Sequence, residues 1–481
     1  MKEKLISLKA DYKDNPGWHW LMATIFLFPI LPEYISPFIL FIGFIVFKVQ
    51  WTKEGRKAKV GTLGKFEMAF MTLALVSVVW SKTKLDTLGM AGLWWGMFLV
   101  QVMIFNLANT KQKINKLLKL IVASASINGL VGAIQICSYA LYDAGYISQQ
   151  FVLQTPFYKG FDEMIYTWLP FDIITNTFDD RASGFFSNPN LLASYMIIAY
   201  PISIFLFLNA KNAKQKNKYF WANLLISAGM SSTLTRAGCV LALFGWLFMF
   251  CVLIKRHYKD LLQIFVPTIA IIFPSILARY GILELPQLPN KTFGNGVTGI
   301  LPTPPPVIEN TAGIDAQRST QVHFEIWKNV IDYLTNNWNV FIGGLGFGCE
   351  STGAMLLAQY ELDKPHAHNF IFEIWAELGI IGIILLSIVI VKAFTMLLVV
   401  NSNNGKRFDL VFCIFTSLML LLLFGLTDFI FNSPKQIILF MILLGITQAI
   451  NYCYETTEIK TPTDFIKATS RGIQGIVKIE K

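Results

Sequence analysis

Apolar residues gather into long runs that alternate with short polar segments along the chain. Twelve such runs are present, and most approach the roughly 20 residues that an α-helix needs to cross about 30 Å of hydrocarbon. The pattern predicts an all-α integral membrane protein with about twelve transmembrane helices in a single polytopic membrane domain, 1–481. The predicted spans are 19–33, 36–50, 66–81, 87–107, 117–141, 190–209, 219–235, 237–254, 262–280, 379–400, 410–427 and 436–452.

Prolines crowd the junction between the first two runs, at Pro29, Pro32 and Pro37. Both runs are short. They are consistent with two separate spans or with one re-entrant unit, and the pattern leaves both arrangements open.

The composition indicates that lipid forms part of the solvent around this chain. Apolar residues make up 54% of it and charged residues 15%, against about 25% charged residues in soluble proteins. A soluble core of this length could not hold so much apolar side chain, so a soluble enzyme, a disordered scaffold and a collagen-like fibre are excluded. The six cysteines show no CxxC or Cys/His zinc spacing and indicate no disulfide framework.

Positive charge is concentrated in every second loop, counted from the N-terminus. The formal net charge is +10, and the intervening loops carry mostly Asp and Glu. Because cytoplasmic loops carry an excess of Lys and Arg, this asymmetry predicts an even number of helices with both termini in the cytoplasm. We interpret the basic charge as this bias, so no nucleic-acid partner is expected.

Two loops on the predicted outer face are long, at 142–189 and 281–378, whereas the C-terminal tail, 453–481, is predicted to be cytoplasmic. The second loop contains a Pro- and Gly-rich arm, 285–306, for which we expect irregular structure. Most of the mass outside the membrane is therefore predicted on the outer face.

An amphipathic helix is predicted further along the second loop, over about 316–335. Val322, Ile326, Val330 and Leu334 recur every four residues. We expect this apolar stripe to pack on neighbouring helices or on the lipid interface. His323 falls on the polar side of the helix and is interpreted as structural.

Cations are few on the predicted outer face, and those present suggest a chemistry. Arg181, Arg236 and Arg318 offer fixed forks of donors that suit phosphate, and two or three such forks can hold a pyrophosphate. His366 and His368 lie just before a predicted helix, where a neutral imidazole could accept a proton. Together these groups predict anion binding with proton transfer.

Simpler interpretations stand beside this one. An Arg at a membrane boundary is often an interface anchor, and a His in a loop is often a solvated surface residue. The segment 343–348 (GGLGFG) lacks the strand and helix of a nucleotide-binding loop, so we interpret it as a turn. Glu373, Glu377 and Asp428 are interpreted as polar positions near helix ends, although carboxylates there can serve as proton sites.

No Asp-x-Asp pair or carboxylate cluster is apparent among the predicted outer-face groups. This absence argues against a metal-dependent transferase that uses sugar nucleotides, so no metal ligand is predicted.

Four segments carry a family resemblance: 181–193 (RASGFFSNPNLLA), 235–238 (TRAG), 343–348 and, most specifically, 368–382 (HNFIFEIWAELGIIG). They resemble the bacterial O-antigen ligase and O-antigen polymerase superfamily, over about 175–400. The first 140 residues match only in hydropathy. Arg236 stands in Thr-Arg-Ala-Gly where many relatives have Ser-Arg-Gly.

The resemblance implies a GT-C-like membrane glycosyltransferase in the bacterial cytoplasmic membrane. It implies a glycan donor carried on undecaprenyl pyrophosphate, an acceptor that is a glycan, lipid or protein, and no cofactor or metal. By the same resemblance, His368 activates the acceptor hydroxyl. The expected substrate-binding residues are Arg181, Arg236, Arg318, His366, Asn190 and Asn369.

Several functions stay open at this point. Polymerase and ligase would share these parts, since they differ only in the acceptor. A transporter, such as relatives labelled as inorganic-carbon transporters, would place ionisable groups at mid-membrane. A flippase for the lipid-linked glycan would need a cationic cavity open to both faces. The cations singled out above all lie on one predicted face, which favours transfer.

Overall fold

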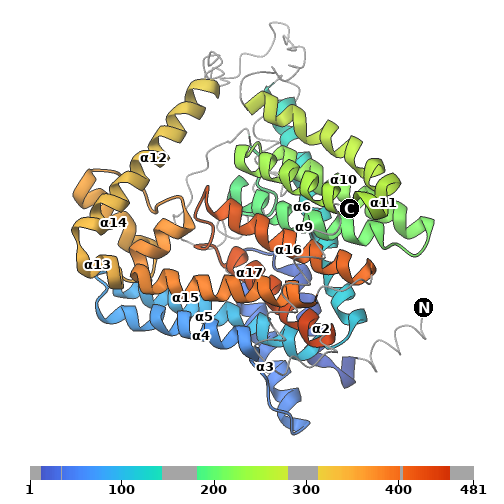
Figure 1. Cartoon of the computed structure of the whole chain (residues 1–481), viewed down its shortest axis with the longest axis horizontal. Helices are drawn as coiled ribbons and strands as arrows, with labels where there is room; N and C mark the ends of the chain where they lie inside the picture. Colours follow the sequence, from blue (N-terminus) through green and yellow to red (C-terminus); the bar gives the residue numbers. More distant parts are fainter. Residues whose placement is uncertain (1–11, 34, 144–180, 280–311, 401–404, 455–481) are drawn as a thin grey trace, which may run out of the picture.

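The computed structural model describes residues 12–33, 35–143, 181–279, 312–400 and 405–454 (Figure 1). Most of the first long loop, the Pro- and Gly-rich arm 285–306 and the C-terminal tail lie outside the described residues. Within that part of the chain the regular structure is helical, without a strand. The helices are α2 (Pro16–Leu27), α3 (Ile35–Lys53), α4 (Gly61–Val76), α5 (Lys84–Leu107), α6 (Lys111–Asp143), α9 (Pro189–Leu208), α10 (Ala213–Ser232), α11 (Arg236–Arg279), α12 (Ala312–Asn336), α13 (Trp338–Gly343), α14 (Cys349–Tyr360), α15 (Phe370–Val400), α16 (Gly405–Gly425) and α17 (Pro434–Tyr454).

The all-α integral membrane fold is confirmed. Among the described residues, nine helices are long and apolar enough to cross a membrane. Large apolar side chains also cover the outside of the bundle, where a soluble protein would carry polar groups. Examples are Phe38, Val79, Leu85, Val266 and Val391, each more than 60% exposed.

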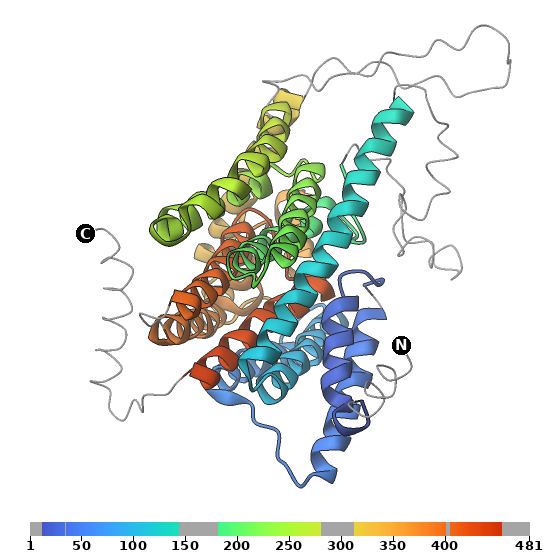
Figure 2. The same cartoon turned by 90° about the vertical axis from the view of Figure 1, so that its right-hand side faces the viewer.

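Each of the twelve predicted spans falls on a helix, although α2 and α10 are not among the nine helices above and α11 holds two predicted spans. α2 has only 12 residues and packs beside α3, where the Gly17 amide donates a hydrogen bond to Gln50 (3.0 Å). These two helices form an antiparallel pair at the right-hand edge of the bundle in Figure 2. α11 contains two predicted spans, because its path bends at His257.

The bend in α11 produces a helical hairpin. The ring of Trp246, before the bend, stacks on the ring of Phe265, after it. His257 has a non-helical backbone, and its Nε2 lies 3.0 Å from a carboxylate oxygen of the buried Asp409 in α16. The two arms of α11 therefore run antiparallel and correspond to the predicted spans 237–254 and 262–280.

The centre of the bundle is formed by α9, α16 and α17. The apolar span of α9 is 94% buried, whereas that of α15 is only 28% buried. α9 begins where it does because the Asn188 side chain accepts a hydrogen bond from the Leu191 amide (3.0 Å) and Pro189 occupies the first turn. This cap places Asn190 at one end of the protein core.

Three helices of the second long loop, α12, α13 and α14, lie together at one end of α4, α5 and α15, at the left in Figure 1. In α12, the predicted amphipathic helix is confirmed. Its stripe is buried in a separate small apolar core, shared with α14 and the start of α15. The residues of that core are Ile326, Val330, Leu334, Met355, Leu356, Ala367 and Ala376.

The glycine-rich segment 343–348 is an irregular turn, as interpreted from the sequence. Gly344 and Gly346 have positive φ, and the Gly346 amide donates to the Glu377 carbonyl of α15 (2.9 Å). A Cβ on Gly344 would meet the Glu377 backbone, and one on Gly346 would meet Ser81. Glycine therefore allows the turn to pack between α15 and the connection before α5.

Candidate functional site

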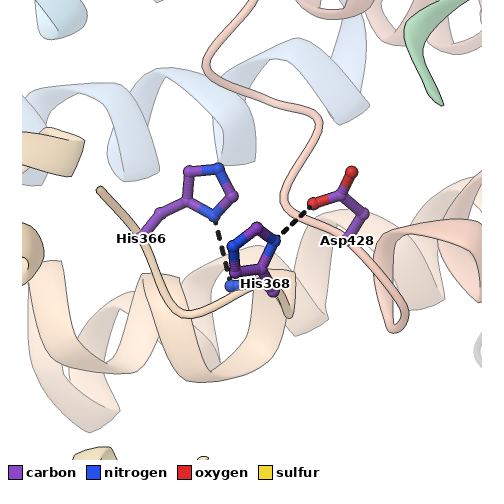
Figure 3. Close-up of side chains that lie close together, drawn as sticks. All are labelled: His366, His368 and Asp428. Atoms are coloured by element: carbon purple, nitrogen blue, oxygen red, sulfur yellow. Dashed lines mark hydrogen bonds and ion pairs between the residues drawn. The ribbon is translucent and has the colours of Figure 1, made fainter. Parts of the chain in front are cut away.

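Four segments that are distant in the chain meet at one end of the bundle. They are the loop before α15, the connection between α16 and α17, the start of α9 and the corner between α10 and α11. Figure 3 shows two of them, with His366 and His368 on the loop facing Asp428 on the connection. The polar side chains from these segments form the candidate site.

His368 is held in an unusual backbone conformation. Its φ is +50°, a region that L-residues seldom adopt outside constrained sites. The next residue, Asn369, caps α15 by accepting a hydrogen bond from the Ile371 amide (2.9 Å), and its Nδ2 donates to the Leu426 carbonyl (2.8 Å). On the other side, Trp327 of α12 donates to the Ala367 carbonyl (2.9 Å). Packing on both sides therefore fixes the histidine.

Asp428 orients the ring of His368. Nδ1 of the histidine lies 3.0 Å from the Asp428 carboxylate, and the same oxygen accepts a hydrogen bond from the Phe429 amide (2.9 Å). An Nδ1–H that donates to a carboxylate places the lone pair of the neutral ring on Nε2. The arrangement is that of a general base whose tautomer is set by an acidic partner.

A second layer of hydrogen bonds holds Asp428. Its other oxygen accepts from Asn190 Nδ2 (2.7 Å), and Asn190 Oδ1 accepts from Arg181 Nη2 (2.9 Å). Arg181 also donates to Thr235 Oγ1 and to the Thr233 carbonyl, each at 3.0 Å. An unbroken path of hydrogen bonds thus runs from the corner after α10 to the candidate base.

The polar network keeps Asp428 ionised. Burial alone would raise the pKa of Asp428. The hydrogen bond from His368, the charges of His368 and His366 and the bond from Asn190 together hold this pKa below its ordinary value. A carboxylate that stays negative can stabilise an imidazolium formed when the ring accepts a proton.

Two further histidines pack against His368. The ring of His323 stacks on it at 4.7 Å between centroids, and the ring of His366 lies at 4.1 Å. Burial, then the charge of His368, lowers the pKa of His366 to about 4 and also lowers that of His323. Both neighbours are therefore neutral near pH 7, which limits the positive charge around the candidate base.

The structure places most of the predicted site residues together. Arg181, Asn190, His366, His368 and Asn369 belong to the network above. The bonds of Asn190 and Asn369 give both side chains a structural role, and their role in substrate binding stays a prediction.

The other two predicted arginines lie at the start of α11 and in α12. Arg236 begins α11 directly after Thr235, and its charge acts on His323. It therefore lies at the edge of the same cluster. Arg318 lies in α12, but its side chain is outside the described part of the structure.

The sequence did not show that Asp428 and His323 contact His368. Asp428 was interpreted as a polar position at a helix end, where a carboxylate can also serve as a proton site, and the structure places it against the candidate base. His323 was taken as structural, yet its ring covers that of His368. The sequence placed His323 on a helix in the same loop as His368, which gave some indication of the contact. Asp428 lies 60 residues after His368, and no pattern in the sequence indicated that they meet.

In the described part of the chain, two clusters have ligand atoms close enough to hold a metal ion, all within 4.8 Å of one another within each cluster. One consists of His366, His368 and Asp428. The other consists of Cys349, Glu373 and Glu377. In the first cluster, hydrogen bonds already join the three residues to one another (Figure 3). That bonding suits proton transfer better than metal ligation.

Comparison with known proteins supports the family resemblance. Residues 221–387 match the family model described as O-antigen ligase. The matched segment includes Arg236, Arg318, His366, His368 and Asn369, whereas Arg181, Asn190 and Asp428 lie outside it. No curated protein matches the chain.

Proposed function

We propose that this chain, which carries an O-antigen ligase domain, transfers a glycan from an undecaprenyl-pyrophosphate donor to an acceptor hydroxyl. The observation that carries the proposal is the hydrogen bond between His368, within the matched segment, and Asp428, beyond it. The bond leaves Nε2 of His368 as the proton acceptor. General-base catalysis of this kind contributes about 10²–10⁴-fold to a rate.

The reaction is a displacement at the anomeric carbon. The acceptor oxygen attacks that carbon as its proton passes to Nε2 of His368. The bond from the carbon to the pyrophosphate oxygen breaks, and undecaprenyl pyrophosphate leaves with the electron pair. A single displacement of this type inverts the configuration of the sugar. Asp428 stabilises the imidazolium until it returns the proton to water.

Arginines hold the leaving pyrophosphate in this proposal. Arg236 lies at the edge of the histidine cluster, and Arg318 lies in the helix that carries His323. Their forks suit the charge that develops on the leaving group. Arg181 adds positive charge and braces Asn190 through the bond described above.

The proposed site faces the outside of the bacterial cytoplasmic membrane. The support is the excess of Lys and Arg in the alternate loops, which assigns both termini to the cytoplasm. Under that orientation the start of α15 lies at the outer end of its span. The donor lipid would then lie against the apolar outer surface of the helices.

The transfer step is proposed to need no metal ion. The histidine and aspartate supply the base, and the arginines supply the positive charge for the leaving group. Activity in proteoliposomes should therefore not rise when Mg²⁺ or Mn²⁺ is added. A large rise with either ion would contradict this part of the proposal.

Reconstitution with a matched undecaprenyl-pyrophosphate oligosaccharide tests the function. Wild type should release undecaprenyl pyrophosphate and form a longer or transferred glycan. The size of the product separates polymerase from ligase. His368→Ala should lose about 10²–10⁴-fold in rate. The matched control is His19→Ala, at a histidine in α2 whose ring contacts Tyr12. Equal rates for wild type and His368→Ala would overturn the proposal.

A further inference from the structure

A second polar cluster lies beside the candidate site and takes no part in the proposed reaction. Cys349 is the first residue of α14, and Glu373 and Glu377 lie in the first two turns of α15. Their spacing of four residues puts both glutamates on the same face of the helix. A thiol sulfur and an oxygen from each carboxylate all lie within 4.8 Å of one another.

The carboxylates of this cluster are buried, and three of their four oxygens have no hydrogen-bond partner among the described residues. Glu373 is 0% exposed and Glu377 is 1% exposed. Among the described residues, Oε1 of Glu373, both carboxylate oxygens of Glu377 and the hydroxyl of the buried Thr352 have no hydrogen-bond partner. The Thr352 side chain, the Gly348 backbone and the other glutamate of the pair lie near these oxygens without completing a bond of normal geometry. Such groups are costly to bury alone.

A third acid increases the negative charge. Asp86, at the start of α5, acts electrostatically on Glu373, Glu377 and Cys349. One of its oxygens accepts from the Glu350 amide (3.2 Å). A Cβ on Gly348 would lie 2.1 Å from that same oxygen, so the backbone is already packed against the carboxylate. Asp86 and Cys349 are partly exposed, whereas the two glutamates are buried between them.

The adjacent histidine cluster provides a comparison within the same molecule. There, each oxygen of Asp428 accepts a hydrogen bond, and the ring nitrogens of His366 and His368 take part in the same network. Protein groups thus satisfy that carboxylate. In the second cluster the facing oxygens need a ligand that the protein does not supply.

We propose that Cys349, Glu373 and Glu377 bind a divalent cation of the Zn²⁺ class. A thiolate with two carboxylate oxygens suits Zn²⁺ better than the harder Ca²⁺ or Mg²⁺. The Thr352 hydroxyl or a water completes four ligands. Binding releases the thiol proton and the proton shared by the two glutamates to solvent, so that one thiolate and two carboxylates, with three negative charges, face two positive charges.

The cation would brace the loop that carries the candidate base. It joins α14 to α15, and the remaining oxygen of Glu373 accepts a hydrogen bond from the Ala367 amide (2.5 Å). Ala367 lies between His366 and His368. The proposed cation is structural, and the inference does not depend on the transfer reaction.

Metal content of the purified full chain tests the inference without an activity assay. After gel filtration in metal-free buffer, wild type should hold about one zinc per chain by elemental analysis. Cys349→Ser and Glu377→Gln should lose most of it. Two controls should keep it: Cys251→Ser, at an exposed cysteine of α11, and His366→Asn, in the competing cluster.

Cobalt substitution provides a second readout that does not rely on the variants folding well. Protein exchanged into Co²⁺ should show the absorption band of a cobalt–thiolate bond, and Cys349→Ser should lack it. The inference is overturned if wild type takes up neither zinc nor cobalt, which would leave Glu373 and Glu377 sharing a proton. It is equally overturned if His366→Asn removes the metal and Cys349→Ser does not.

Discussion

The two polar clusters near the start of α15 differ in how far hydrogen bonds satisfy their buried carboxylates. Around His368 and Asp428, protein groups meet each other in an almost complete network of hydrogen bonds. Around Glu373 and Glu377, three of the four carboxylate oxygens have no hydrogen-bond partner among the described residues. The Ala367 amide, which bonds to Glu373, links the two clusters through a single short loop.

The difference indicates different tasks. A satisfied network fixes the position and protonation of each member, which is what a general base requires. An unsatisfied set of negative groups is stable only with a proton or a cation added. We therefore assign proton transfer to the first cluster and ligand binding to the second. The following predictions test that division.

Asp428→Asn should lower the rate of transfer most, because it removes the negative charge that the hydrogen bonds around Asp428 stabilise. The amide can occupy the same space but cannot stabilise an imidazolium, and it can favour the wrong tautomer. We expect the kcat of transfer to fall by about 10²-fold or more, with the KM for the donor nearly unchanged. A rise in KM without a loss in kcat would show that Asp428 binds substrate instead.

Arg181→Lys should have a smaller effect on the same network. A lysine cannot make the three hydrogen bonds to Thr233, Thr235 and Asn190, so Asn190 would lose its support. We expect a loss of about tenfold in kcat, near the value of one hydrogen bond to a charged group. Arg236→Lys serves as the comparison and should instead weaken donor binding. Equal effects of the two variants on kcat and KM would contradict separate roles.

Gly344→Ala tests the packing beneath the acidic cluster. An added Cβ would lie 2.1 Å from the Glu377 carbonyl oxygen, at a residue with φ of +75°. Strain of this kind costs about 1–3 kcal/mol, so the midpoint of thermal unfolding in detergent should fall.

Gly343→Ala is the matched control for that variant. A Cβ at Gly343 meets nothing within 4 Å. Its midpoint should stay near that of wild type, and equal losses for both variants would contradict the close packing of the turn.

Acid should destabilise the histidine cluster gradually. The pKa of His366 is about 4 in the folded chain and about 6.5 when unfolded, so between these values only the unfolded chain binds the proton. Stability is therefore complete above pH 6.5 and falls as pH drops toward 4, by up to about 1.4 kcal/mol per pH unit. The pKa of His323 is also lowered in the folded chain, so His323 adds to the loss of stability at acid pH.

The pH dependence can be assigned with one variant. The stabilisation from Asp428 is present above its unfolded pKa of 3.8 and is lost only as the pH falls below that value, because its folded pKa is lower. His366→Asn keeps an acceptor for the His368 amide but does not titrate. Its thermal midpoint should change less than that of wild type between pH 7 and pH 5. An identical slope would show that His366 is not the responsible group.

Much of the fold could be predicted from sequence because hydropathy is local. The apolar runs identified the spans, and the stripe through Ile326 and Val330 identified α12 with the correct buried face. The two arms of α11 were predicted as separate spans, whereas the helical structure on both sides of the bend at His257 was not.

The candidate site was only partly predictable. The motif around His368 drew attention to the base, but its partner Asp428 comes from another connection. The acidic cluster was missed for the same reason. The absence of an Asp-x-Asp pair suggested no grouping of carboxylates, yet folding brings Asp86 to Glu377 from far along the chain. Contacts of this range leave no local pattern.

The central claim is that His368 and Asp428 act as one unit in glycan transfer. A double-mutant cycle in proteoliposomes tests it most directly, by comparing the release of undecaprenyl pyrophosphate by wild type, His368→Ala, Asp428→Asn and the double variant. The account predicts that the double variant is about as slow as His368→Ala, because the aspartate acts only through the histidine. Losses that multiply in the double variant would show that the two residues act independently and would contradict the account.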